Sequence, residues 1–287
     1  MTSVRKPVQV LKSVPTMEGA GVRLRRAFGH AEAPTFDPFL LLDDIHSGNP
    51  SDYMAGFPWH PHRGIETVTY VLHGDVDHGD SIGNSGAIGD GDVQWMTAGS
   101  GIIHQEMPRK VSGDMRGLQL WVNLPASRKM MDPRYRDIMA GTIPVVRNDN
   151  GTAVRVIAGR HKDVAGPMED LVQAPSYYDV EVPAGETFTC DLPEEHTVFA
   201  YVLSGQGRFS TVEGSEYGAE HVVLYGRGEQ VSIRGGDTGV RFLLIAGQPI
   251  GEPVAWGGPI VMNTEEELHT AFREFREGTF IKVGSRP

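Results

Sequence analysis

The sequence predicts an all-β protein with two β-barrels in tandem, and three observations lead to this prediction. The 287 residues suffice for two domains of ordinary size or for one large β domain. The 36 glycines and 19 prolines exceed the average share of these residues, which indicates many turns between short elements. A short motif also returns once along the chain, at a distance that suits a pair of barrels.

Short apolar or alternating runs, each bounded by turn residues, recur along the chain. Runs of this length and pattern are typical of β-strands, whereas apolar residues at helical spacing are scarce. The expected strands are Val8–Val10, Val22–Leu24, Phe39–Leu42, Glu66–Leu72, Val93–Met96, Leu118–Val122, Val154–Ala158, Tyr177–Val182, Val198–Leu203, His221–Leu224, Val231–Ile233 and Val240–Ala246.

One short helix is expected near the end of the chain. The segment Asn263–Glu267 supplies an N-cap residue and the acid of a capping box. Apolar residues then recur at the spacing of one helical face, which predicts packing against a sheet; they are Leu268, Ala271, Phe272 and Phe275.

The repeated motif is Tyr70–Gly74, which returns as Tyr201–Gly205 at an offset of 131 residues. In both copies a Tyr-Val-Leu strand runs into a glycine turn. The polar stretch Pro125–Asn150 lies between the copies and is expected to be a connector. Within it, Ser127–Met139 predicts a short helix or turn whose length Pro133 limits. The domains are therefore placed at residues 1–135 and 136–287.

Charge and cysteine content narrow the classes of function. The 37 acidic residues outnumber the 26 basic ones, and a net charge of −11 disfavours direct nucleic-acid binding. The single cysteine, Cys190, excludes an intrachain disulfide and a four-cysteine zinc site. The sequence also lacks the apolar stretches of a signal peptide or a membrane span, so a cytoplasmic protein without membrane contact is expected.

Two pairs of metal-ligand residues stand about 40 positions apart. His60 and His62 are separated by one residue, as are His104 and Glu106, so on extended backbones each pair points to one side. Three imidazoles and one carboxylate suit a first-row divalent cation. Four such ligands on an octahedral ion leave two positions open, which distinguishes a reactive site from a structural one.

Glu66 follows His62 by four residues and would share its face on a continuous strand. Three roles remain open for it: a fifth ligand, an acceptor that holds a ligand imidazole, or an ordinary polar residue, and we favour the second. The eight other histidines lack such pairing and are expected to be exposed or hydrogen-bonded; they are His30, His46, His73, His78, His161, His196, His221 and His269.

The pattern His-X-His-X3-Glu, then a glycine-rich turn and a further histidine, resembles the motifs of the cupin superfamily. The longer strings at residues 60–74, 80–86, 97–108 and 120–125 resemble the pirin family. Pirins are bicupins, two jelly-roll-like barrels in one chain, with a metal in the amino-terminal barrel only. The resemblance implies Fe(II), with other divalent first-row metals as alternatives, on His60, His62, His104 and Glu106. It also supports the view that Glu66 is not a ligand.

The 131-residue offset tests the second half of the chain for an equivalent site. Asp191, Pro193 and Thr197 stand where the first half has His60, His62 and Glu66, and no His-X-Glu pair follows. The carboxyl-terminal barrel is therefore expected to hold no metal and to serve a structural or partner-binding role. Cys190, nearby, is expected to be a buried small apolar residue.

Pirins are similar in site chemistry to quercetin 2,3-dioxygenases, which implies oxidative ring cleavage of a flavonol with release of carbon monoxide and a depside. Glu106 would also be the base that takes the substrate's hydroxyl proton. Aromatic and apolar residues near the ligands in sequence suit a flat substrate; they are Phe57, Trp59, Trp95 and Met96.

Two other functions stay open. The family also contains iron-dependent regulators that bind a transcription factor or a metabolic enzyme, and both roles need an accessible ion. A small-molecule isomerase or another cupin oxygenase is the third alternative, because a fold does not fix a reaction.

Overall fold

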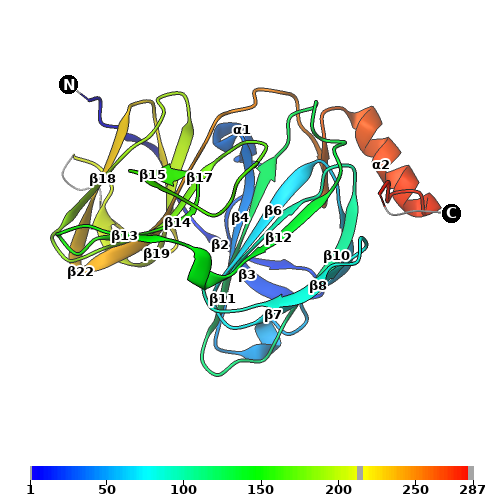
Figure 1. Cartoon of the computed structure of the whole chain (residues 1–287), viewed down its shortest axis with the longest axis horizontal. Coiled ribbons are helices and arrows are strands. Elements are labelled where there is room, and N and C mark those ends of the chain that lie inside the picture. Colours follow the sequence, from blue (N-terminus) through cyan, green and yellow to red (C-terminus); the bar gives the residue numbers. More distant parts are fainter. Residues whose placement is uncertain (1, 212–215, 284–287) are drawn as a thin grey trace. The chain divides into compact units, whose positions relative to one another are not determined.

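The structure is a computed structural model that describes residues 2–211 and 216–283 (Figure 1). Its contacts divide the chain into two compact units, and each unit takes three segments of the sequence. One unit, here the first barrel, contains Val14–Thr35, Phe39–Ala140 and the chain from Ile250 onward. The other, the second barrel, contains the chain up to Ser13, Phe36–Pro38 and Gly141–Pro249. The boundary between residues 135 and 136 stays a prediction.

The first barrel is made of two antiparallel sheets. A seven-stranded sheet has the order β12-β9-β6-β11-β4-β3-β2, and a four-stranded sheet has the order β5-β10-β7-β8. The strands are β2 (Val14–Glu18), β3 (Val22–Phe28), β4 (Phe39–Ser47), β5 (Phe57–His62), β6 (Ile65–His73), β7 (Val76–Asp80), β8 (Ser85–Ile88), β9 (Val93–Thr97), β10 (Ile102–Pro108), β11 (Met115–Asn123) and β12 (Arg134–Ile138).

The second barrel contains a nine-stranded sheet with the main order β1-β21-β19-β22-β17-β14-β13, to which β18 and β20 are added. A separate hairpin pairs β15 with β16. The strands are β1 (Pro7–Lys12), β13 (Val145–Arg147), β14 (Ala153–Ala158), β15 (Arg160–His161), β16 (Val164–Ala165), β17 (Ser176–Val182), β18 (Thr187–Asp191), β19 (Thr197–Arg208), β20 (Glu216–Gly218), β21 (His221–Tyr225) and β22 (Gln230–Gly247).

The repeated Tyr-Val-Leu motif occupies equivalent strands in the two sheets. It lies on β6, between β9 and β11, and on β19, between β21 and β22. The remaining strands correspond one by one, with β4, β3 and β2 matched by β17, β14 and β13. One edge differs, since β12 closes the first sheet while β1, from the start of the chain, closes the second. Apart from that edge, the main sheets of the two barrels therefore share one strand order.

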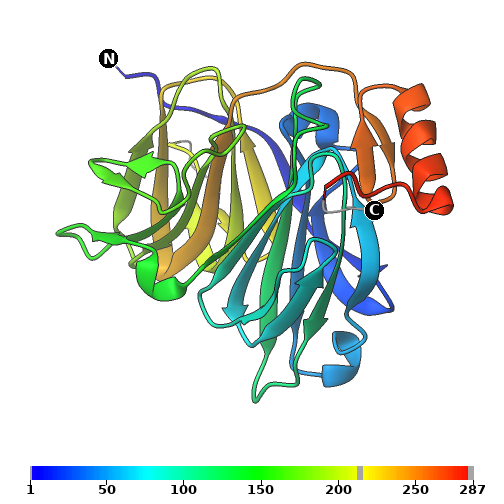
Figure 2. The same ribbon diagram turned by 45° about the vertical axis from the view of Figure 1, so that its right-hand side comes forward.

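The last part of the chain returns to the first barrel. A hairpin of β23 (Ala255–Gly257) and β24 (Ile260–Met262) precedes α2 (Glu265–Glu277), which packs beside it (Figure 2). Thr264 caps α2 in a capping box with Glu267, as the sequence predicts, and Gly278 ends it in the left-handed conformation. The other helices are short: α1 (Ala33–Phe36) and the 3-10 turns η1 (Pro50–Asp52) and η2 (Ala140–Thr142).

The expectation of a short helix at Ser127–Met139 is half wrong. Residues near Arg128 form turns, but Arg134–Ile138 is strand β12, which pairs with β9 in register Arg134 to Thr97. The free edge of β9 offers a full ladder of backbone hydrogen bonds, and this tertiary pairing outweighs the weak local preference for a helix.

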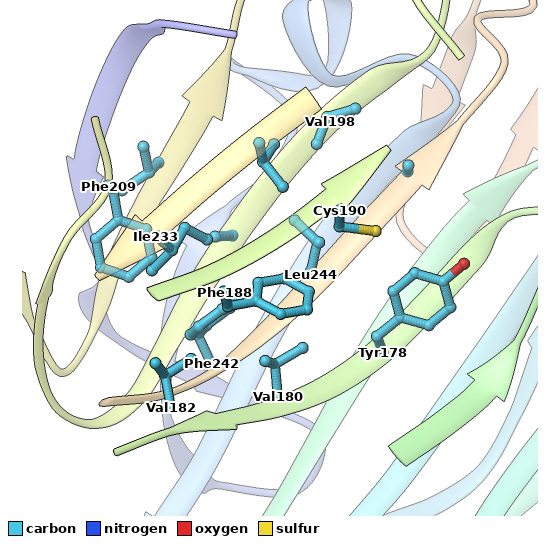
Figure 3. Packing of buried hydrophobic residues seen from close by; sticks show 14 of the residues in the cluster. Tyr178, Val180, Val182, Phe188, Cys190, Val198, Phe209, Ile233, Phe242 and Leu244 are labelled. Atoms are coloured by element: carbon cyan, nitrogen blue, oxygen red, sulfur yellow. The ribbon is translucent and has the colours of Figure 1, made fainter. Parts of the chain in front are cut away.

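The core of the second barrel is mainly apolar. Its buried cluster includes Phe188, Phe209, Phe242 and Leu244, whose side chains point inward from β18, β22 and the chain after β19 (Figure 3). Cys190 belongs to this cluster and is buried, as expected (Figure 3). No helix among the described residues is long and apolar enough to span a membrane.

Candidate metal centre

Strands β5 and β10 bring the predicted histidines together. They pair antiparallel, with His104 opposite His60 and Ile102 opposite His62. Pro58 and Pro61 cannot donate backbone hydrogen bonds, and β5 is accordingly an edge strand of its sheet. The register shifts between His104 and Glu106, so that Glu106 lies opposite Phe57.

The three imidazoles converge on one point. His60 Nε2 lies 3.0 Å from His62 Nε2, and the ring centroids of His60 and His104 are 4.4 Å apart. One nitrogen from each of His60, His62 and His104 falls within 4.8 Å of the others, which makes these residues a group able to hold a metal ion. His62 and His104 are each only 1% exposed, while His60 borders the cavity described below.

Burial keeps His62 and His104 uncharged. Desolvation, reinforced by the neighbouring imidazoles, holds the pKa of His62 well below its ordinary value. The same causes, with burial again the largest, lower the pKa of His104. Neutral rings at pH 7 have lone pairs free to bind a cation.

The outward nitrogens of the first pair bond to backbone carbonyls. His60 Nδ1 lies 2.8 Å from the Pro58 carbonyl oxygen, and His62 Nδ1 lies 3.1 Å from that of Pro259. Each carbonyl accepts the proton of the ring nitrogen it faces, so Nε2 is left with its lone pair directed at the cluster. Both nitrogens of His104 are buried without a hydrogen-bond partner among the described residues.

The C-terminal segment is fixed beside His62 by the turn that follows this residue. Gly64 has φ 79°, and a Cβ there would lie 1.9 Å from the carbonyl oxygen of Val261, so only glycine allows this approach. The buried ammonium of Lys129 donates to the carbonyls of Gly64 and Val261, each at 2.9 Å, and to Asn123 Oδ1 at 2.7 Å.

Arg63 makes a second connection to the same segment. Its guanidinium donates to the Phe280 carbonyl at 2.9 Å and pairs with Glu274 at 2.8 Å. The guanidinium carbon also lies 4.2 Å from the centroid of the Phe280 ring. Lys129 and Arg63 therefore both fix the chain segment that supplies the Pro259 carbonyl.

Glu106, the fourth predicted ligand, lies at the margin of the cluster. Its Oε2 is 4.0 Å from His104 Nε2. Thr69 donates to Glu106 Oε1 at 2.7 Å, and Gln119 donates to Oε2 at 2.9 Å. The oxygen of the Gln119 amide in turn accepts from the Trp121 indole at 3.1 Å. These bonds hold the carboxylate inside the barrel, close to the histidines.

Glu66 does not hold a ligand imidazole. Its carboxylate accepts from the Thr97 hydroxyl at 2.7 Å, on the face of β6 opposite to Thr69. The expectation assumed that one strand runs from His62 to Glu66, but the left-handed Gly64 separates β5 from β6 and breaks the alternation. The carbonyl of Pro259, from a distant part of the chain, takes the role expected of Glu66.

A cavity of about 590 Å³ opens beside the cluster and includes His60 and His62 in its wall. Of the aromatic and apolar residues expected near the ligands, Phe57 lines the cavity, whereas Trp59 is 55% exposed and Trp95 and Met96 are in the core. Three other aromatic residues line the cavity, and the sequence analysis does not predict them because they lie far from the ligands in sequence: His30, Trp121 and Trp256.

These rings form a continuous wall. Trp121 meets His62 edge to face at 5.1 Å between centroids and lies 5.9 Å from Trp256, which is 5.1 Å from His30. Trp121 lies in the segment at residues 120–125 that resembles the pirin family, whereas no sequence pattern near the histidines indicates Trp256.

The second barrel has different residues at the position equivalent to the histidine cluster. Thr197 donates to the backbone oxygen of Asp37, and Cys190 Sγ lies 3.7 Å from His161 Nδ1. Burial raises the pKa of the Cys190 thiol to about 12, so the sulfur is not a thiolate at neutral pH.

Three convergent imidazoles, a nearby carboxylate, and two His104 nitrogens that have no hydrogen-bond partner in the described part of the chain fit a divalent first-row metal. Two barrels whose main sheets share one strand order, with this group in the first, define the protein as a bicupin of the metal-binding class. Family models described as Pirin and as Pirin C-terminal cupin domain match residues 21–122 and 177–281. The chain belongs to the pirin family.

Comparison with individual relatives supports the family assignment. The chain is 46% identical to a pirin-like protein of Caulobacter vibrioides over 96% of its length and 99% of the relative. It is 41% identical to Pirin-1 of Arabidopsis thaliana, over 90% of this chain and 88% of that one. Among solved structures, a quercetin 2,3-dioxygenase from Acinetobacter baumannii matches with a TM-score of 0.89 and 33% identity, over 97% of this chain and 99% of that chain.

Proposed function

We propose that this protein is an iron-dependent dioxygenase of the quercetin 2,3-dioxygenase type, which acts on a flavonol or a similar flat aromatic molecule. The observation that carries the proposal is the group of three imidazoles, two of which, His60 and His62, lie in the wall of an aromatic cavity. The similarity to the dioxygenase from Acinetobacter baumannii over nearly the whole chain supports it.

Four residues would hold the metal: His60, His62, His104 and Glu106. Fe(II) bound there would supply Lewis acidity toward the substrate oxygen and the one-electron chemistry that reactions of dioxygen require. Neutral nitrogen donors with one carboxylate suit Fe(II), and they also suit other divalent first-row ions. We assign iron as the native metal and a small aromatic molecule as the substrate.

We assign the proton transfer to Glu106. When a hydroxyl of the substrate approaches the cluster, its O–H bond breaks and the proton passes to a carboxylate oxygen of Glu106. Thr69 and Gln119 keep that carboxylate oriented, and each retains its bond to one of the two oxygens. These two bonds hold the base in one orientation before the substrate arrives.

The aromatic wall binds and shields the substrate. Trp121, Trp256 and Phe57 present apolar surfaces on which a flat ring can stack, and these surfaces exclude water from the space beside His62.

Reconstitution with Fe(II) under anaerobic conditions, followed by exposure to air, tests the proposal. Wild-type protein should take up oxygen and remove the visible absorbance of a flavonol, and His60→Ala and Glu106→Gln should abolish or strongly reduce both. His46→Gln, at a surface ion pair with Asp114, is the matched control and should behave as the wild type. Stoichiometric iron binding without any loss of flavonol would refute the dioxygenase function.

A metal-dependent regulator is the second candidate. The observation that favours it is Trp59, whose exposed ring lies on the strand that carries His60 and His62, so that a protein partner at this surface would contact the same strand as the metal. Affinity capture from cytoplasm, where we place the protein, with and without metal, tests it. Identical captured proteins in both conditions, unchanged by Trp59→Ser, would refute it.

A further inference from the structure

Three charged residues lie in the wall of the cavity beside the histidines, and the proposed proton transfer does not use them. Arg26 on β3 pairs with Asp43 on β4 through two bonds, Nε to Oδ1 at 2.9 Å and Nη2 to Oδ2 at 2.8 Å. Arg26 Nη2 also lies 2.9 Å from Glu18 Oε1. All three residues line the cavity, and together they are called the Arg26 triad.

Stability alone does not account for the triad. The Asp43 side chain is 7% exposed, and a buried ion pair is seldom more stabilising than apolar side chains of the same volume. The neighbouring pair of Asp44 and Arg116 has similar bonds, with 2.9 Å between Arg116 Nη2 and Asp44 Oδ2, but it faces the other side of β4 and is not part of the cavity wall. Of these two ion-paired groups, the Arg26 triad is the one that lines the cavity beside the histidines.

The triad retains hydrogen-bonding capacity. Its bonds use Nε and Nη2 of Arg26, and Nη1 has no partner among residues 2–211 and 216–283. Each Asp43 oxygen can accept a further hydrogen bond beside the one from Arg26, and the Glu18 carboxylate can also accept more. Burial raises the pKa of Asp43 to about 6, although Arg26 opposes this, so the carboxyl is ionised above pH 7.

The charges of the triad select the chemistry of its ligand. One guanidinium and two carboxylates leave one excess negative charge, which disfavours an anionic group. A hydroxyl fits, because it donates to a carboxylate and accepts from a guanidinium, and two adjacent hydroxyls can do both at once. The tryptophan wall in the same cavity suits the aromatic ring that would carry them.

We propose that the Arg26 triad is a hydroxyl-binding subsite that selects substrates with a hydroxylated aryl ring distant from the oxygen that reacts at the histidines. This inference rests on the proposed function, because it concerns the substrate of the same cavity. A cavity of about 590 Å³ is within the range that holds a molecule of flavonol size, so one substrate reaches both regions.

Binding of three flavonols that carry two, one or no hydroxyls on the pendant phenyl ring tests the subsite. Affinities are measured by calorimetry on Fe(II)-loaded protein without oxygen, so that nothing is consumed. Wild-type protein should bind the dihydroxy compound about 10-fold more tightly than the compound without hydroxyls, with the monohydroxy compound between them. This preference should fall below about 3-fold in Glu18→Gln and in the double variant Arg26→Gln/Asp43→Asn.

The control is Asp44→Asn/Arg116→Gln, which changes the same residue types on the other face of β4 and should keep the full preference. Glu18 is partly exposed, so its variant should fold even if the double variant does not. Equal affinities for the three compounds in wild type, or an undiminished preference in Glu18→Gln, would overturn the subsite and leave the proposed function standing. Failure of wild type to bind any of them would refute the flavonol substrate and the subsite together.

Discussion

Replacing Lys129 with methionine tests whether the C-terminal segment forms part of the metal centre. Methionine keeps most of the volume of this 1% exposed side chain but removes its three hydrogen bonds to Gly64, Asn123 and Val261. Bonds from a charged donor contribute about 1.5–3 kcal/mol each, or about 5–9 kcal/mol for the three.

An opposing contribution reduces the expected loss. Burial lowers the pKa of Lys129 from 10.5 to about 8, which corresponds to about 3 kcal/mol against the charged form at neutral pH. Methionine removes that cost, so we expect Lys129→Met to lower the free energy of unfolding by roughly 2–6 kcal/mol. Loosening of Val261 also loosens the nearby carbonyl of Pro259, which orients His62, and metal affinity should fall about 10- to 100-fold.

Urea unfolding of metal-free protein measures the first quantity, and competition with a metal-sensitive dye measures the second. Lys110→Met, at an exposed lysine, is the matched control and should change neither. A loss of less than about 1 kcal/mol together with unchanged metal affinity would refute the structural role assigned to Lys129.

Three further predictions concern the same region. Gln119→Leu removes one of the two donors to Glu106 and should weaken metal binding about 10-fold in a competition titration; unchanged affinity would show that the amide does not position the carboxylate. Gly64→Ala should cost about 3 kcal/mol or more in urea unfolding, because the added Cβ meets a backbone oxygen at a positive φ, and a stable variant would contradict that geometry. In metal-free protein the lowered pKa values of His62 and His104 mean that below about pH 6.5 the unfolded chain binds more protons than the folded one. The free energy of unfolding should then fall with decreasing pH by up to about 1.4 kcal/mol per pH unit for each histidine, and a His62→Gln/His104→Gln variant that keeps this slope would refute the assignment.

Sequence reasoning works best where the signal is local. Every expected apolar run lies within a strand. A strand buries the side chains of one face or both, and this leaves a short apolar or alternating pattern in the sequence itself. The capping box at Thr264 and Glu267 is equally local. The two predicted ligand pairs also come from spacing alone, because the side chains of an extended segment alternate.

The errors and omissions have tertiary causes. The expectation that Glu66 supports a histidine depends on one unbroken strand from His62 to Glu66. The left-handed Gly64 interrupts that strand, so the expectation is wrong. Arg134–Ile138 becomes a strand because β9 has a free edge. The Pro259 carbonyl and the Trp256 ring reach the site only because the chain returns to the first barrel after Ile250, which no pattern near the histidines reveals.

The metal content of the protein, purified without chelators and measured by elemental analysis, tests the central claim most directly. We expect close to one divalent first-row ion per chain in wild type and in the surface control His46→Gln. We expect almost none in His62→Gln/His104→Gln, checked to be folded by circular dichroism. An equal metal content in the double variant, or a wild-type protein that stays empty after incubation with Fe(II) under anaerobic conditions, would contradict the claim.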